Sequence, residues 1–208
     1  MISAVVLNYN DYLLTEKYVR RLEQIKEIDH IVVVDNCSHD DSYEQLKALV
    51  NDRIDVIRTG SNVGYAGGNN YGITYIVKKF GESGRVLISN PDIEIEDDAV
   101  GELSREFERD NTLFAVTGLL HNRYGKVIPS FIWKLPTIPM LFINCSIVLR
   151  GVAFKVFSYG TRYDFSGQER LKKELLYGDA IPGCFFMADL KKMRELGLFC
   201  PRTFLFFE

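Results

Sequence analysis

The sequence predicts an α/β protein with a mostly parallel central sheet and helices on both faces. Two short runs of Val, Ile and Leu, at residues 3–7 and 31–34, are apolar on both faces, and each precedes a segment with helical spacing of apolar residues. Strands of this kind belong to parallel sheets that are covered on both sides, and their alternation with amphipathic helices indicates βαβ units.

Composition supports one folded core and argues against nucleic acid as a partner. The chain has 208 residues, of which 47% are hydrophobic, so it can bury a sizeable core. Its 25 basic and 28 acidic residues give a net charge of -3, with no positive excess to bind a phosphate backbone. The four cysteines form no Cys-x-x-Cys pair, which favours reduced thiols in the cytoplasm over a zinc site or a disulfide framework. We expect the three histidines to be solvated.

Two helices are expected after the first two strands. Their apolar positions are Leu13, Tyr18 and Leu22 in the first, and Tyr43, Leu46, Leu49 and Val50 in the second. Ser38 or Asp40 is expected to cap the second helix, because their side-chain oxygens can accept from exposed backbone N–H groups.

A stretch rich in glycine and asparagine, residues 62–72, follows a third strand at 55–59. Its sequence is Asn-Val-Gly-Tyr-Ala-Gly-Gly-Asn-Asn-Tyr-Gly. Glycine permits positive φ and close approach of a ligand, and asparagine supplies both a donor and an acceptor. We therefore predict a loop that cradles a polar ligand, the alternative being a long turn that only reverses the chain.

The later elements follow from similar signals. A helix to Phe80, a strand at 85–89, a helix to Arg109 with acidic residues in its first turn, and a strand at 114–119 are expected. A hairpin is expected around Tyr124 and Gly125, then a strand at 181–188, a short helix at 189–196 and an apolar run at 204–207. Residues 135–178 show no clean period.

Polar residues follow four of the predicted strands. They are Asn8, Tyr9 and Asn10, then Asp35 and Asn36, then the glycine-rich stretch, then Asn90 and Asp92. Each group alone has a structural alternative, as a turn, a loop or a helix cap. Ligands of doubly wound sheets bind beyond the carboxyl ends of the strands, so their coincidence predicts a binding site at this edge.

These motifs resemble, in order and spacing, the family-2 glycosyltransferases, in particular a rhamnosyltransferase-like branch. The resemblance is strong over residues 3–98 and weaker through 182–187, 197–199 and 204–208. It implies a GT-A fold, which is Rossmann-like, with a nucleotide-sugar-binding half at 1–120 and an irregular acceptor-side half at 121–208. The implied reaction moves a sugar with inversion from a UDP- or dTDP-sugar to a glycan or lipid-linked acceptor, in bacterial surface polysaccharide synthesis.

The resemblance also implies roles for particular residues. Those expected to bind the nucleotide sugar are Asn8, Tyr9, Asn10, Asp35, Asn36, Asn62, Gly64, Gly67, Gly68, Asn69 and Asn90. Asp92 stands where the family has its metal-binding Asp-x-Asp motif, although the first acid is here Asn90. The expected cofactor is Mg²⁺ or Mn²⁺, since a departing diphosphate needs its charge neutralised.

Inversion further requires a carboxylate that takes a proton from the acceptor hydroxyl. In the family this carboxylate comes from a Glu-Asp pair. Glu208 matches the Glu of that pair, and the Asp would be the next residue. We therefore expect a C-terminally truncated chain, with Glu208 as the candidate base. The alternative is a nucleotide-sugar-binding module or assembly partner without turnover. A dinucleotide oxidoreductase is set aside, because Asn8-Tyr9-Asn10 holds no glycine.

Location and acceptor contacts are the last expectations. The N-terminus lacks the features of a signal peptide, and the longest uncharged run, 135–149, is too short to span a bilayer. We expect a cytoplasmic protein, with peripheral contact to the inner face of the membrane left open. The aromatic stretch 131–163, with Trp133, is either an acceptor groove, a membrane-facing surface or core.

Overall fold

The computed structural model describes residues 1–125, 128, 138, 177–200 and 202–203. Two compact units divide the chain: Met1–Gly118 together with Gly183–Glu208, and Leu119–Pro182. The predictions for the aromatic stretch at 131–163, for the apolar run at 204–207 and for Glu208 fall outside the described residues, except that Ile138 within the aromatic stretch is described.

The first unit is built on a six-stranded sheet with strand order β3-β2-β1-β4-β6-β5. The strands are β1 (Ile2–Asn8), β2 (His30–Asp35), β3 (Ile54–Arg58), β4 (Arg85–Ser89), β5 (Ala115–Val116) and β6 (Phe185–Asp189). β1 to β4 run parallel, β6 is antiparallel to β4, and β5 is antiparallel to β6. The predicted mostly parallel sheet is confirmed.

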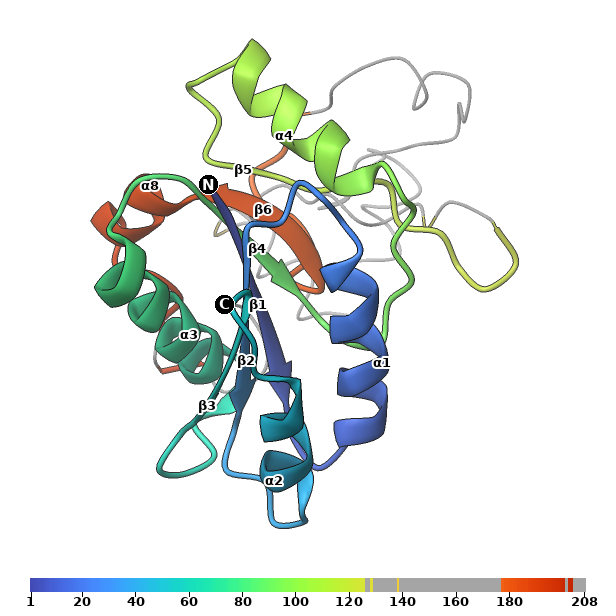
Figure 1. The fold of residues 1–208 in the computed structure, drawn as a ribbon. Coiled ribbons are helices and arrows are strands. Elements are labelled where there is room, and N and C mark those ends of the chain that lie inside the picture. The colour runs from blue at the N-terminus through green and yellow to red at the C-terminus, as the bar shows by residue number, and fades with distance from the viewer. Residues whose placement is uncertain (126–127, 129–137, 139–176, 201, 204–208) are drawn as a thin grey trace, which may run out of the picture. The chain divides into compact units, whose positions relative to one another are not determined.

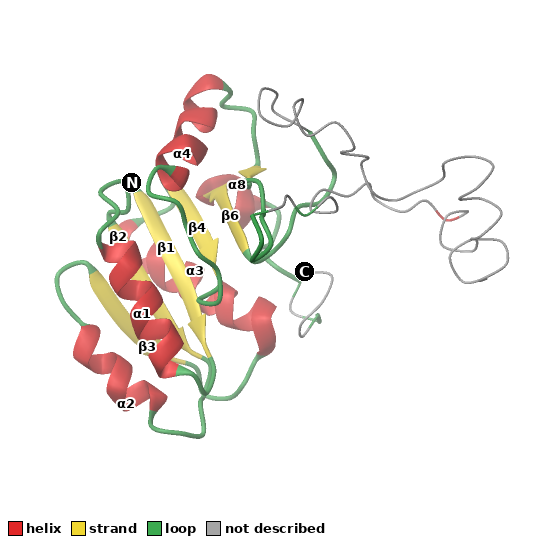
Figure 2. Cartoon of the chain, turned by 90° about the vertical axis from the view of Figure 1, so that its right-hand side faces the viewer, coloured by secondary structure: helices red, strands yellow, loops and turns green. Residues whose placement is uncertain are grey.

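Helices cover both faces of this sheet (Figures 1 and 2). They are α1 (Tyr12–Glu23), α2 (Ser42–Leu46) with the 3-10 helix η1 (Lys47–Leu49), α3 (Gly64–Phe80), α4 (Ala99–Arg109) and α8 (Leu190–Glu195). α1 and α2 lie on one face, and α3 lies on the other (Figure 2). Within the described part of the chain, no helix is both long and apolar enough to cross a bilayer.

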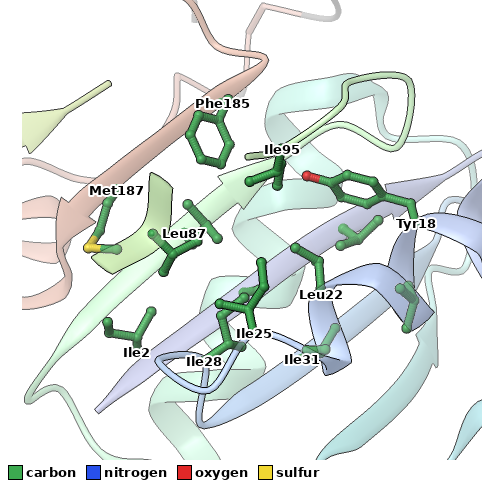
Figure 3. Close-up of a cluster of buried hydrophobic side chains, with 14 of the residues drawn as sticks. Ile2, Tyr18, Leu22, Ile25, Ile28, Ile31, Leu87, Ile95, Phe185 and Met187 are labelled. Carbon is green, nitrogen blue, oxygen red and sulfur yellow. The ribbon is translucent and has the colours of Figure 1, made fainter. Parts of the chain in front are cut away.

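The main core lies between the sheet and α1, with α4 beside it. Alternate strand residues such as Val6 and Leu87 belong to this cluster. Leu87 of β4 lies in it with Tyr18 and Leu22 of α1 (Figure 3). Their neighbours, such as Val5, are equally buried but face α3. Burial on both faces explains why the strand sequences are continuously apolar.

The predicted apolar face of α1 is wrong at one position. Leu13 is 66% exposed, whereas Thr15, Tyr18, Val19 and Leu22 are the buried residues of this helix. Asp11 caps the helix by accepting from the backbone N–H of Leu14 at 3.2 Å. Leu13 therefore falls on the exposed side of the first turn.

The glycine-rich stretch forms a helix, so the predicted loop is wrong from Gly64 onward. α3 begins at Gly64 and runs through the whole motif to Phe80. A Cβ placed on Gly72 would lie 2.7 Å from Val5 Cγ1 and 2.9 Å from Val34 Cγ2, and one on Gly68 would lie 2.4 Å from a methyl carbon of Leu7. These glycines let the helix lie unusually close to β1 and β2.

Several shorter elements differ from prediction in extent. The strand expected at 114–119 has only two paired residues, Ala115–Val116, and the strand expected from 181 begins at Phe185, after a turn. α8 is confirmed, with Asp189 as its cap. A turn lies at Tyr124 and Gly125, where Gly125 has φ +73°.

The cap predicted for α2 is partly wrong. The Asp40 side chain accepts from the backbone N–H of Ser42, the first residue of the helix, at 3.0 Å. Ser38 instead bonds to Asp35 and Asn10, at the carboxyl edge of the sheet.

Candidate functional site

The carboxyl ends of the parallel strands meet at one edge of the sheet. Asn8, the last residue of β1, lies beside Asp35, the last residue of β2, and Asp35 lies beside Arg58 of β3. The pairing continues past the strands, because the backbone N–H of Asn36 donates to the carbonyl of Asn8 at 2.9 Å. This edge brings the predicted residues of β1 and β2 into contact.

Asp35 is fully buried, with 0% of its surface exposed, and its carboxylate is held by protein donors. One oxygen accepts from Asn8 Nδ2 at 2.9 Å and from Ser38 Oγ at 2.5 Å. The other accepts from the backbone N–H of Ser38 at 3.1 Å and lies 3.2 Å from Arg58 Nε. The buried Asp35 carboxylate therefore connects the end of β1, the loop after β2 and the end of β3.

Asn8 is equally enclosed. Its Nδ2 donates to Asp35 and, at 3.2 Å, to Ser38 Oγ, while its Oδ1 accepts from Thr15 Oγ1 at 2.8 Å. Tyr9, the next residue, is 43% exposed. The surface that a ligand can reach at the end of β1 thus comes from Tyr9 and Asn10.

The loops after β1 and β2 are joined by hydrogen bonds, and each contains a residue with an unusual backbone conformation. Asn10 and Cys37 have φ of +55° and +60°, values that residues other than glycine rarely adopt. Asn10 donates its N–H to Ser38 Oγ at 2.9 Å and accepts from the N–H of His39 at 2.8 Å. The rings of Tyr9 and His39 then meet edge to face, with centroids 6.2 Å apart.

Asn36 and Asn62 shape the entry into α3. Asn36 Nδ2 donates to Asn62 Oδ1 at 3.0 Å and to the carbonyl of Gly64 at 3.1 Å, and its Oδ1 accepts from the N–H of Val63 at 3.0 Å. Gly64 has φ +73°, which explains why glycine stands there. Both asparagines thus connect β2 to the start of the helix.

The other motif residues predicted to bind the ligand lie in packing positions. A Cβ on Gly67 would lie 2.7 Å from Val63 Cβ, and Gly68 faces Leu7. Asn69 is buried and donates to the carbonyl of Tyr65 at 3.0 Å, within α3.

The end of β4 forms a second polar region on the same edge. The backbone N–H of Asn90 donates to the carbonyl of Cys184 at 2.9 Å, and Asp92 is exposed. Tyr18 and Ser89 share a hydrogen bond beneath this turn. Burial raises the pKa of the Tyr18 phenol, which the bond to Ser89 partly offsets, and the charge of Asp92 raises it further. Asp92 follows Ser89, the last residue of β4, by three residues.

Sequence reasoning missed Ser38 and Tyr18 as parts of this edge. The sequence indicates Ser38 only as a helix cap, although an Asp side chain often accepts from a backbone N–H a few residues further on, as Asp35 does from Ser38. Tyr18 was assigned to the core by its helical spacing, and only the structure reveals that its hydroxyl reaches the end of β4.

A divalent cation would have one protein carboxylate at this turn. Within the described residues, no three His, Cys, Asp or Glu side chains lie close enough to hold a metal ion. Mg²⁺ is often held by one or two carboxylates with substrate phosphates supplying further oxygens. Asp92, with the Asn90 amide two residues before it in the chain, fits that pattern.

An open, mostly parallel sheet with polar groups gathered beyond the carboxyl ends of its strands is the arrangement in which doubly wound α/β proteins bind their ligands. The fold resembles that of GalNAc-T7 solved with UDP, GalNAc and Mn²⁺, with a TM-score of 0.66 at 15% identity, covering 97% of this chain and 37% of that one. It also resembles S. aureus TarS 1-349, with a TM-score of 0.51 at 19% identity, covering 64% and 40%. The fold is GT-A.

The sequence comparison then gives the family. The model for glycosyl transferase family 2 matches residues 3–178, and the chain belongs to this family. A relative from Haloferax volcanii, low-salt glycan biosynthesis hexosyltransferase Agl10, is 36% identical over 103 residues. That match covers 49% of this chain, and the chain spans 31% of the length of that relative. The rhamnosyltransferase-like branch stays a prediction.

Proposed function

We propose that this chain binds a nucleotide-activated sugar, a UDP- or dTDP-sugar, and transfers the sugar with inversion to a glycan or lipid-linked acceptor. The observation that carries the proposal is the interlocked edge built on Asp35, where the loops after β1 and β2 are held in strained conformations by buried hydrogen bonds. Strain of this kind is kept where a binding surface must be preorganised.

In this proposal the nucleoside lies against the exposed groups of the edge. Tyr9 and Asn10 contact the base and ribose. The buried Asn8 and Asp35 do not touch the ligand; they bond to Ser38, which in turn accepts from the N–H of Asn10 and so holds Asn10 in place. The remaining motif residues support the nucleotide by placing α3 close to the sheet; they are Asn36, Asn62, Gly64, Gly67, Gly68 and Asn69.

Asn90 and Asp92 serve the diphosphate. Asp92 holds Mg²⁺ or Mn²⁺ together with the phosphate oxygens, and the cation, when bound, neutralises the charge that develops as the diphosphate departs. The net charge of -3 supports this, because the protein has no general positive surface to do so.

The acceptor side completes the proposal. Residues 1–120 bind the donor and residues 121–208 serve the acceptor, with Glu208 as the candidate base. The proposed place is the cytoplasm, peripheral to the inner face of the membrane, where a lipid-linked acceptor for bacterial surface polysaccharide would be met.

A thermal-shift screen with a turnover assay tests this function. UDP, dTDP and their sugars are added with and without Mn²⁺ or Mg²⁺, since a ligand that binds only the native state raises the melting temperature. We expect a metal-dependent shift that is lost in Asp92→Ala and kept in Asp98→Ala, an exposed acid further along the segment. Absence of any shift overturns the proposal; a shift without release of nucleotide diphosphate, with acceptor present, favours a binding module.

A further inference from the structure

Contacts that the proposed function does not use join α3 to the segment that contains β6 and α8. The Asn70 side chain makes two hydrogen bonds with the backbone of Phe199. Asn70 Nδ2 donates to the Phe199 carbonyl at 2.9 Å, and the Phe199 N–H donates to Asn70 Oδ1 at 3.0 Å. The side-chain amide thus satisfies both backbone groups of Phe199, as a neighbouring strand would. α3 and α8 lie on the same side of the sheet (Figures 1 and 2).

Tyr65 makes the second link, at the other end of that segment. The Tyr65 hydroxyl donates to the carbonyl of Gly183. A Cβ on Gly183 would lie 3.3 Å from the Tyr65 hydroxyl oxygen, so the glycine leaves room for the tyrosine. The Tyr65 ring also meets Phe199 edge to face, with centroids 5.9 Å apart, and Phe199 meets Phe186 in the same way at 6.1 Å. α3 thus holds the segment both before β6 and after α8.

The residue next to Gly183 is in direct contact with the proposed metal turn. The carbonyl of Cys184 accepts from the backbone N–H of Asn90 at 2.9 Å, and β6 pairs with β4 up to Ser89. A displacement of Gly183 and Cys184 would therefore move the Asn90–Asp92 turn.

We propose that Tyr65 and Asn70 are positioning residues for the Asn90–Asp92 turn and thereby set the affinity for the divalent cation that binds with the diphosphate. The inference rests on the proposed function, because it assigns the cation to Asp92. Neither side chain has to touch the ligand. A turn that is already fixed loses less entropy when it binds, so it binds the cation more tightly.

Tyr65→Phe tests this inference, because it removes the hydroxyl and keeps the ring. The measured quantity is the Mn²⁺ concentration that gives half of the UDP-dependent rise in melting temperature, relative to each variant's own melting temperature without ligand. We expect this concentration to rise about fivefold, the loss that one hydrogen bond gives. Tyr71→Phe, which removes a hydroxyl from the exposed side of the same helix, should leave it unchanged.

Combination with Asp92→Ala separates positioning from general damage. If Tyr65 acts through the turn, Tyr65→Phe has no further effect on UDP binding once Asp92 is absent. Asn70→Asp, which keeps the acceptor for the Phe199 N–H and loses the donor, should raise the Mn²⁺ requirement in the same direction and decides the matter if Tyr65→Phe does not fold. An unchanged Mn²⁺ requirement in both variants overturns the inference, whereas a wild type without any nucleotide shift overturns the proposed function itself.

Discussion

At the scale of single residues, Asp35 is the organising group of the edge. It is the only carboxylate among the buried residues that the structure describes, and four protein donors surround it. Charge-assisted hydrogen bonds are roughly twice as strong as neutral ones. A carboxylate at this position therefore holds the loops after β1 and β2 in their strained forms.

Asp35→Asn should lower the free energy of unfolding by about 2–3 kcal/mol, because an amide NH₂ would face the donors of Ser38 or Asn8. Urea unfolding at pH 7 measures the change. Asp52→Asn, at an exposed acid before β3, should stay within about 0.5 kcal/mol of the wild type. A loss at Asp35 as small as this control would refute its organising role.

At the scale of elements, the glycines of α3 determine how closely the helix packs on the sheet. Gly72 faces two valines, whose branched side chains cannot turn away from an added methyl group. Gly101 in α4 faces only the flexible end of Glu27, with 3.4 Å to Oε1. The same substitution at these two helical glycines should therefore have opposite effects.

Gly72→Ala should destabilise the protein by about 1–2 kcal/mol, since overpacking outweighs the gain in helix propensity. Gly101→Ala should stabilise the protein by about 0.5–1 kcal/mol, because the higher helix propensity of alanine is gained there without a clash. Thermal or urea unfolding of both variants makes the comparison. Stabilisation by Gly72→Ala would mean that α3 can move away from the sheet without cost.

A polar cluster ties α3 to β2 and β3 at the opposite edge. Asp55 accepts from Lys79 Nζ at 2.6 Å and lies 2.7 Å from His30 Nε2. His30 is buried, so our expectation of solvated histidines is wrong there. Burial alone would raise the pKa of Asp55, but the bonds from Lys79 and His30 hold it below its ordinary value.

Because the folded-state pKa of Asp55 lies below the unfolded value of about 4, its ionised form stabilises the fold above that pH. Lys79→Met should cost about 0.5 kcal/mol at pH 7, a small value because Lys79 is exposed to solvent and its attraction is screened. The difference from wild type should shrink as pH falls from about 4 through the folded-state pKa. Lys78→Met is the matched control, and a difference independent of pH would contradict the ion pair.

The elements differ in how far the sequence predicts them, for physical reasons. β1 and β2 follow directly from apolar runs, since burial on both faces leaves few alternatives. The sequence predicts the helix up to Phe80 but treats the first turns of α3, from Gly64, as a loop, because propensity scales penalise glycine, whereas close packing of the helix on the sheet requires it. The helix-to-sheet distance is a tertiary property, and no local pattern reports it.

The site shows the same limit. That the polar residues after β1 and β2 share one edge follows from parallel strand order alone, and the structure confirms this placement. The sequence does not predict which of these side chains face inward. Asn8 and Asp35 are buried, and Ser38, from the loop after β2, bonds back to Asp35. Sequence reasoning treated all polar residues there as equally available.

At the scale of the molecule, the first unit has two unlike edges. The carboxyl edge carries strained loops and the exposed Asp92, while the amino edge carries the paired cluster at His30 and Asp55. A nucleotide diphosphate with a divalent cation needs exposed polar groups and a carboxylate beyond the carboxyl ends of the strands, and the loops after β1 and β2 together with Asp92 supply them there.

Hydrogen–deuterium exchange with UDP and Mn²⁺ tests this claim most directly, because it locates the ligand without assuming turnover. We predict that exchange slows at residues 8–10, 36–40 and 90–92, at the carboxyl ends of β1, β2 and β4, and is unchanged at residues 28–30 and 81–84 on the opposite edge. Protection at the opposite edge, or no protection at any of these segments under conditions where UDP binds, would contradict the account.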